Sequence, residues 1–171
     1  MTSHGLKLVL AGVLCSFTGA ATGTRLAEML RHEERLNLGK PLPDGIVVSA
    51  RDGTSVDLRE ALRGPAIVLV VASDCPPCDE LLGYVARQQP QGRMPDGTRL
   101  AVLQFGDDVV EAAGIPEQIP VYVSPAPRGK GFFEGEITPA AYFFDSSLVL
   151  TGKRLGMAGD GGSMLVPPDQ P

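Results

Sequence analysis

Two cysteines lie close together in the stretch VASDCPPCDE, residues 71–80. Cys75 and Cys78 flank two prolines and follow an apolar run directly. A pair of thiols at this spacing can form a redox centre, supply half of a metal site, or close a structural disulfide. The rest of the sequence has to distinguish these three kinds of chemistry.

The metal and structural alternatives find little support elsewhere in the chain. A structural zinc site needs four ligands, most often Cys or His. The other cysteine, Cys15, lies in an N-terminal apolar segment, and the two histidines, His4 and His32, lie in or beside it. The remaining chain also lacks a His or Met at a suitable spacing for copper delivery. A disulfide across so short a loop stabilises a fold poorly, so an inert bridge stays as the alternative to redox chemistry.

The cysteine pair lies where a strand is predicted to end and a helix to begin. The β-branched apolar run 66–72 predicts a strand buried on both faces, and residues 79–88 predict a helix. Cys75 then lies near the N-cap, with Pro76 at the first helical position and Pro77 next. Proline suits this turn because its missing N–H would have no intrahelical partner there.

This placement assigns a role to each sulfur. The positive end of the helix favours the thiolate of Cys75, and thiolate is the nucleophile in disulfide exchange. Cys78, one turn further on, lies on the same side and can bond to Cys75. It would attack the mixed disulfide and release the product.

The other predicted elements indicate an α/β fold. Strands alternate with helices and a hairpin ends the series, which is typical of a mixed central sheet flanked by helices. Further strands are predicted at 46–49, 54–56, 99–105, 121–123, 141–144 and 148–150, and short helices at 57–62 and 107–113. The first two of these strands form an N-terminal hairpin, because Asp52-Gly53 favours a tight turn.

The length of the chain indicates its size as a folded domain, and its net charge bears on whether it binds nucleic acid. The chain has 171 residues, enough for one domain with a core, and a net charge of −5. Nucleic-acid binding needs clustered Lys and Arg, so a nucleic-acid partner is not expected.

Residues 8–24 carry no charge and lie between Lys7 and Arg25. Their length is at the short edge for a helix that spans a bilayer. We expect an uncleaved membrane anchor, with a cleaved signal peptide ending near 19–21 and a buried core helix as the alternatives. The expected organisation is an anchor or signal segment with a short helix at 1–38, a domain at 39–156, and a flexible tail at 157–171.

Three stretches resemble the thioredoxin-like superfamily, most closely its membrane-anchored TlpA/ResA/MauD-type redoxins. They are GKPLPDGIVV, LREALRGPAIVLVVASDCPPC and ITPAAYFFDSSLVLTGKRLG, within residues 39–156. The specific features are the CxxC at a strand-to-helix turn and a Thr-Pro before a late strand. The resemblance implies a cis Pro139 facing the active site and a Thr138 backbone that seats the substrate.

The resemblance also implies the remaining parts of the site. Pro76 and Pro77 are the other residues expected to contact substrate. The redox-active disulfide Cys75–Cys78 would be the only redox group, with no further cofactor and no metal.

The sequence departs from its relatives at three places. Asp74 stands where relatives often have Trp, and an acid there opposes formation of the Cys75 thiolate. Leu69 stands where thioredoxins carry a buried acid, with Asp79, Glu80 and Glu136 as possible substitutes. The Gly-rich end after residue 156 predicts no long closing helix.

The expected function is that of an exported, membrane-tethered thiol–disulfide oxidoreductase. The resemblance implies a reductase supplied by a membrane electron donor and acting on cysteines of exported proteins, for example in cytochrome c or amine dehydrogenase maturation. Its place would be the bacterial inner membrane, as a single-pass protein whose domain faces the periplasm or the cell exterior. A peroxidase is disfavoured because residues 68–75 lack the Pro-x-x-x-Thr-x-x-Cys pattern, and a non-catalytic binding scaffold is the alternative.

Overall fold

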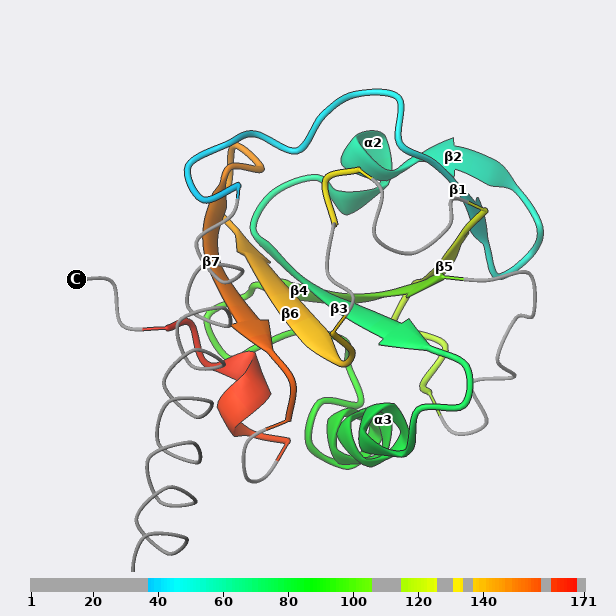
Figure 1. Ribbon diagram of the computed structural model, residues 1–171, viewed down its shortest axis with the longest axis vertical. Coiled ribbons are helices and arrows are strands. Elements are labelled where there is room, and N and C mark those ends of the chain that lie inside the picture. The colour runs from blue at the N-terminus through cyan, green and yellow to red at the C-terminus, as the bar shows by residue number, and fades with distance from the viewer. Residues whose placement is uncertain (1–36, 106–114, 126–130, 134–136, 158–160, 169–171) are drawn as a thin grey trace, which may run out of the picture. The chain divides into compact units, whose positions relative to one another are not determined.

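The computed structural model describes residues 37–105, 115–125, 131–133, 137–157 and 161–168 (Figure 1). Contacts divide the chain into two units, residues 1–34 and 35–171, and all described residues belong to the second. The predicted apolar segment 8–24 and the predicted helix 107–113 lie outside the described residues. Within the described part, no helix is both long and apolar enough to cross a membrane.

The centre of the fold is the strand β3 (Ala66–Ala72), whose seven residues are all buried. It pairs in parallel with β4 (Arg99–Phe105) and antiparallel with β6 (Ala140–Phe144). Apolar side chains suit both faces of a strand that is covered on both sides, so β3 and β4 have the bounds that the sequence predicts.

Four further strands complete a seven-stranded sheet in the order β2-β1-β5-β4-β3-β6-β7. β5 (Val121–Ser124) is parallel to β4, and β7 (Leu150–Leu155) is antiparallel to β6. The hairpin of β1 (Val47–Ala50) and β2 (Ser55–Asp57) lies one residue later than predicted and pairs with β5. The mixed sheet with flanking helices agrees with the predicted fold class.

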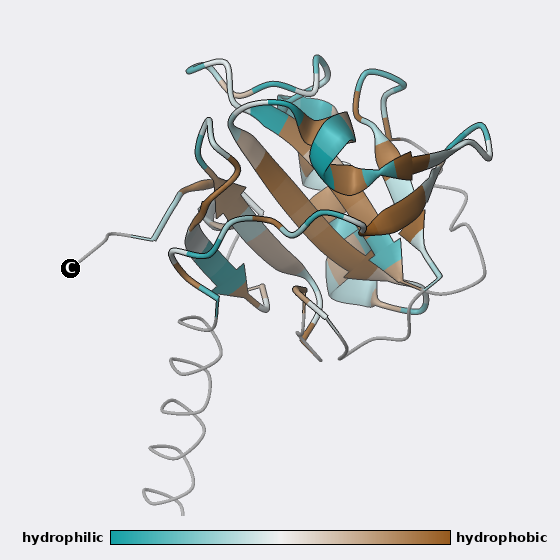
Figure 2. Cartoon of the chain, turned by 90° about the horizontal axis from the view of Figure 1, so that it is seen from above, coloured by the Kyte–Doolittle hydropathy of each residue, from teal (hydrophilic) through white to brown (hydrophobic). Residues whose placement is uncertain are grey.

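The two described α-helices lie on opposite faces of the sheet (Figure 1). α2 (Leu58–Leu62) is capped by the Asp57 carboxylate, which accepts hydrogen bonds from the backbone N–H groups of Arg59 and Glu60. α3 (Pro76–Gln88) follows β3 directly and buries Cys78, Leu81 and Val85. The hydropathy colouring shows apolar strands between these helices and polar residues at the loops (Figure 2).

Each face of the sheet has its own core, which we call the first-face core and the second-face core. The first-face core includes Leu58 and Leu62 of α2 together with a group of aromatic side chains. The second-face core includes Leu81 and Val85 of α3 and the sulfur of Cys78. β3 contributes alternate side chains to both, as its pleat requires.

The C-terminal residues differ from the predicted flexible tail. Residues 161–168 contain a 3₁₀ turn, η1 (Ser163–Leu165), in which Met164 and Leu165 are buried in the second-face core. The three consecutive apolar residues 164–166, in a Gly- and Pro-rich stretch, show no periodicity, so the sequence gives no sign of this packing. The turn covers part of the second face of the sheet, in a stretch where no long closing helix is predicted.

Candidate active site

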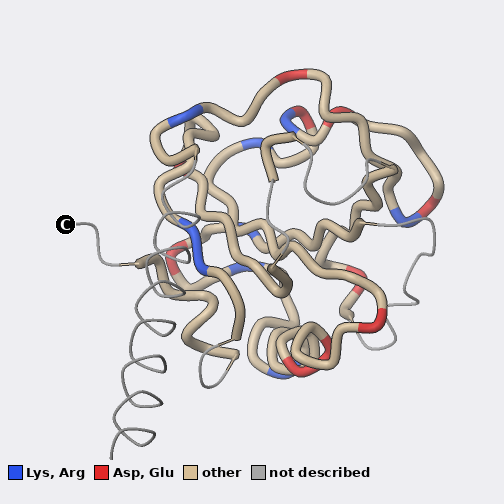
Figure 3. Tube along the Cα trace, viewed as in Figure 1, with Lys and Arg blue, Asp and Glu red and all other residues tan. Residues whose placement is uncertain are grey.

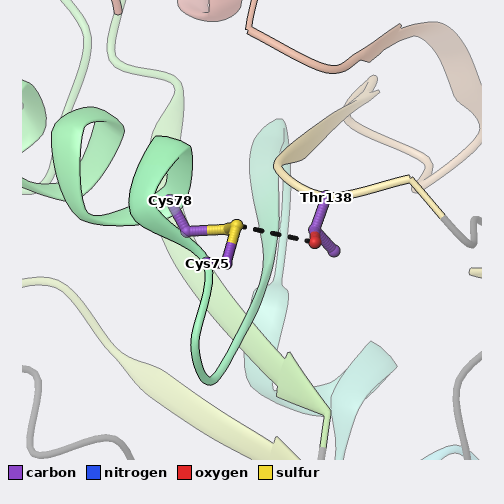
Figure 4. The surroundings of a disulfide bond; sticks show 3 residues. All are labelled: Cys75, Cys78 and Thr138. Carbon is purple, nitrogen blue, oxygen red and sulfur yellow. Dashed lines mark hydrogen bonds between the residues drawn. A yellow bond between two sulfur atoms is a disulfide. The ribbon is translucent and has the colours of Figure 1, made fainter.

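Cys75 and Cys78 form a disulfide at the first turn of α3, with their Cα atoms 5.2 Å apart (Figure 4). Cys75 is the N-cap residue of the helix, and Pro76 is its first residue, as the sequence predicts. The carbonyl of Cys75 accepts hydrogen bonds from the backbone N–H groups of Cys78, at 2.8 Å, and Asp79, at 3.2 Å. The local strand-to-helix geometry therefore brings the two sulfurs together.

The two bonded cysteines differ in accessibility. Cys78 is 1% exposed and lies within the second-face core, whereas Cys75 is partly exposed at the margin of that core. Pro76 and Pro77, between them, are exposed. A sulfur atom of another protein can therefore approach Cys75 but not Cys78. Attack by an outside thiolate would occur at Cys75, and Cys78 would act from within.

A segment distant in the chain completes the site. The Thr138 hydroxyl donates a hydrogen bond to Sγ of Cys75 at 3.6 Å, and the Thr138–Pro139 peptide bond is cis, as the resemblance implied (Figure 4). Thr138 lies here because β6, which begins at Ala140, pairs with Val70 near the end of β3. The structure thus brings Thr138 and Pro139 to the cysteine pair. The hydroxyl contact was not predicted, since the expectation concerned the Thr138 backbone.

Carboxylates, rather than basic groups, stand next to the cysteines in the chain. Asp74 precedes Cys75, is exposed, and has a left-handed backbone with φ of 54°. Asp79 and Glu80 are also exposed, in the first turns of α3. An acid near a thiol disfavours its ionisation, whereas the helix end and the Thr138 hydroxyl favour it.

The buried acid of thioredoxins has no counterpart among the described residues. Leu69 occupies the corresponding position and is fully buried, and no described Asp or Glu side chain is buried. Glu136, one possible substitute, lies outside the described residues. Within the described part there is also no group of three or more His, Cys, Asp or Glu side chains that could hold a metal ion.

The sequence gives no signal for a hollow along α3, the helix that begins at the cysteine pair. It has a volume of about 370 Å³ and lies between α3 and the chain that follows β7. Its lining residues are Asp79, Glu80, Gly83, Tyr84, Arg87, Met157 and Gly161. Met157 and Gly161 belong to the region predicted to be a flexible tail, so only the tertiary structure brings them to α3.

Comparisons with known proteins identify the fold. No protein-family model and no curated protein matches the sequence. Solved structures do match. A candidate thiol:disulfide interchange protein DsbE from Chlorobium tepidum has a TM-score of 0.58 and 17% identity, and the match covers 72% of this chain and 88% of that one.

Two other solved structures have a similar fold. The thioredoxin domain of a thiol-disulfide oxidoreductase from Bacteroides vulgatus has a TM-score of 0.53 and 14% identity, over 71% of this chain and 91% of that one. A DsbF homologue from Corynebacterium diphtheriae has a TM-score of 0.55 and 15% identity, over 74% and 83%. The chain therefore has the thioredoxin-like fold, which confirms the fold that the sequence resemblance implied.

Proposed function

We propose that this protein is a thiol–disulfide oxidoreductase that exchanges electrons with cysteines of other proteins. The observation that carries the proposal is the difference between the two bonded sulfurs: Cys75 is partly exposed and contacts Thr138, while Cys78 is buried behind it. An inert structural bridge needs no such asymmetry. The thioredoxin-like fold, shared with solved oxidoreductases, supports the same conclusion.

The exchange proceeds through a mixed disulfide. In the reduced protein, the Cys75 thiolate attacks one sulfur of a substrate disulfide; that S–S bond breaks, and the released substrate thiolate takes a proton. The Cys78 thiolate then attacks Sγ of Cys75, which frees the second substrate thiol and restores the Cys75–Cys78 bond. Two electrons pass from the protein to the substrate, and the reverse sequence oxidises a substrate dithiol.

Thr138 assists at the sulfur that reacts. Its hydroxyl already points at Sγ of Cys75 in the oxidised protein. In the reduced protein the same hydroxyl can donate to the thiolate, and a hydrogen bond to the charged form stabilises that form. Pro76 and Pro77 are exposed between the bonded cysteines and offer apolar contacts to a substrate chain. Pro139 is buried, so it would act through the position of its neighbour Thr138.

We further propose that the protein is a reductase of the bacterial inner membrane. Its N-terminal segment would tether it there, with its domain on the periplasmic or outer side. The uncharged residues 8–24 and the resemblance to membrane-anchored redoxins support it. Its partners would be exported proteins with cysteines and a membrane electron donor, as in cytochrome c or amine dehydrogenase maturation. Membrane fractionation, protease accessibility in spheroplasts and N-terminal sequencing of the full chain test the location and the anchor.

Reduction of insulin by dithiothreitol tests the activity. Wild-type protein should accelerate the precipitation of insulin chains, and Cys75→Ser should abolish the acceleration. Cys78→Ala should instead accumulate disulfide-linked partners on Cys75, because the mixed disulfide cannot resolve. No acceleration by the wild type, with no trapped partner, would leave a non-catalytic scaffold as the function.

A further inference from the structure

The hollow begins at Asp79, in the helix that starts at the cysteine pair, and Cys75 itself does not line it. Cys75 and Asp79 lie four residues apart at the start of α3, so they follow one another on the same side of the helix. Asp79 and Glu80 both line the hollow. A polypeptide whose cysteine meets Sγ of Cys75 therefore has the hollow about one helical turn away, roughly 5 Å along the helix.

Tyr84, Met157 and Gly161 form the apolar part of the lining of the hollow. Gly161 is buried against Tyr84, and a Cβ atom added at Gly161 would lie 2.8 Å from Cβ and Cγ of Tyr84. Met157 and Tyr84 both pack against the second-face core, as Cys75 does. This surface suits the methylene stem of a long side chain, because such stems pack on apolar and aromatic groups.

The charges around the hollow are mainly negative near the cysteines. Asp74, Asp79 and Glu80 are all exposed, and Arg87 is the one basic residue that lines the hollow. The Arg87 guanidinium lies over Gly83, with Nη1 3.3 Å from where a Gly83 Cβ would be. Within the described residues no ion pair joins Arg87 to Asp79 or Glu80. Along α3, Asp79 and Glu80 therefore lie nearer to Cys75 than Arg87 does. Figure 3 colours the acidic and basic positions along the chain.

We propose that this hollow selects substrates by accepting a Lys or Arg side chain of the substrate, one or two residues from its reacting cysteine. The stem would lie on Tyr84 and Met157, and the cationic group would lie between Asp79 and Glu80. The proposal rests on the proposed function, because it concerns the polypeptide that reaches Cys75. Charge complementarity favours this occupant, since opposite charges raise the rate of encounter and fix the register of the complex.

Three synthetic peptides provide the test. Each has one cysteine in a mixed disulfide with thionitrobenzoate, and they differ only in flanking residues: lysine, glutamate or serine. The reduced full-length protein transfers two electrons to the mixed disulfide; peptide thiol and thionitrobenzoate are released, and Cys75–Cys78 forms. The released thionitrobenzoate is followed by its absorbance. Rates with dithiothreitol on the same peptides correct for the intrinsic reactivity of each.

We expect the corrected rate for the lysine peptide to exceed that for the glutamate peptide by about tenfold at low salt. The ratio should fall as salt is added, because exposed charges are screened. Asp79→Asn combined with Glu80→Gln should bring the ratio close to one. The rate with the serine peptide reports any change in the reactivity of Cys75 itself. The ratio of the lysine-peptide rate to the glutamate-peptide rate therefore isolates the effect of the substrate's charge.

A matched control removes two carboxylates from the other face of the sheet. Asp44→Asn with Glu60→Gln changes the net charge by the same amount. Glu60 lies in α2, and Asp44 forms an ion pair with Arg59 of that helix. This variant should keep the wild-type ratio. Equal rates for the lysine and glutamate peptides, or an unchanged ratio after the Asp79 and Glu80 substitutions, would overturn the selection proposal. Failure of all three peptides to react faster than with Cys75→Ser would instead overturn the proposed function.

Discussion

On one face of the sheet, aromatic rings pack against one another; on the other, aliphatic side chains surround the sulfur of Cys78. The first-face core holds Phe132, Phe133, Tyr142 and Phe144, with neighbouring ring centroids 4.9–6.3 Å apart. Among the buried residues of the second-face core that the structure describes, Phe143 carries the one aromatic ring. Both cores rest on the same strand, β3, through its alternate side chains.

The first face of the sheet therefore contributes mainly to stability, whereas the second face also carries the cysteine pair. The aromatic cluster contains neither cysteine of the disulfide, and its role is to bury apolar area. The second-face core ends in the cysteine pair, at the point where β3 stops and α3 starts. Changes to the first face should therefore lower stability without altering the disulfide exchange of molecules that stay folded, and changes at the pair should do the reverse.

The largest expected effect on stability is that of Phe133→Ala. Phe133 is 3% exposed and contacts Phe132, Tyr142 and Phe144 edge-on. Truncating a buried Phe leaves a cavity and should lower the free energy of unfolding by about 3–5 kcal/mol, measured by urea denaturation. Under conditions where the variant is folded, its insulin-reduction rate should stay within about twofold of the wild type. A large rate loss in the folded variant would show that the two faces are coupled.

Met164→Ala tests the cover of the second face. Met164 is 2% exposed in η1, so its truncation should cost about 2–4 kcal/mol of unfolding free energy. The control is Val166→Ala, two residues later, whose side chain is 55% exposed and whose loss should cost less than about 0.5 kcal/mol. Equal and small effects of both substitutions would mean that this segment does not cover the core.

Thr138→Val should affect chemistry and leave stability nearly unchanged. The substitution keeps the side-chain shape and removes the hydroxyl that contacts Cys75. Loss of one hydrogen bond to the reacting sulfur corresponds to about 1 kcal/mol, or roughly a fivefold slower alkylation of Cys75 in the reduced protein. Thr151→Val is the matched control, because the Thr151 hydroxyl on β7 donates to the carbonyl of Phe143 on β6. An alkylation rate unchanged in both variants would remove Thr138 from the site.

The smallest expected effect is a dependence of stability on pH at the cap of α2. Backbone N–H groups of Gly45, then Arg59 and Glu60, donate to Asp57 and lower its pKa below the ordinary value of 3.8. Because the pKa of Asp57 is lower in the folded state, its ionised carboxylate stabilises the fold above pH 3.8. This stabilisation is lost as the pH falls through the pKa that Asp57 has in the folded protein.

Asp57→Asn keeps an acceptor at the cap but does not titrate. The urea midpoint of this variant should therefore fall less steeply at low pH than that of the wild type. The comparison variant is Glu60→Gln, whose side chain caps no backbone group in the described structure. Parallel pH curves for wild type and Asp57→Asn would contradict the assignment.

Much of the fold was predictable because the signals are local. The continuous apolar runs of β3 and β4 are typical of strands buried on both faces, and Asp57 and Pro76 mark where the two helices begin. The last strand was predicted at 148–150, whereas β7 begins at Leu150 and continues to Leu155. Its polar residues hide the pattern: Lys153 is 3% exposed, with its ammonium group 5.5 Å from the centre of the Tyr142 ring.

The sequence by itself determined the strand–turn–helix that carries Cys75 and Cys78, because hydrophobic runs, proline and helix-start geometry act within a few residues. The tertiary structure decided which sulfur faces solvent, and it brought Thr138 to Cys75 across 63 residues by pairing β6 with β3. It also placed Met157, Gly161 and Met164 against α3 and the sheet. Such contacts depend on surfaces that exist only after the sheet has formed, so no local pattern in the chain encodes them.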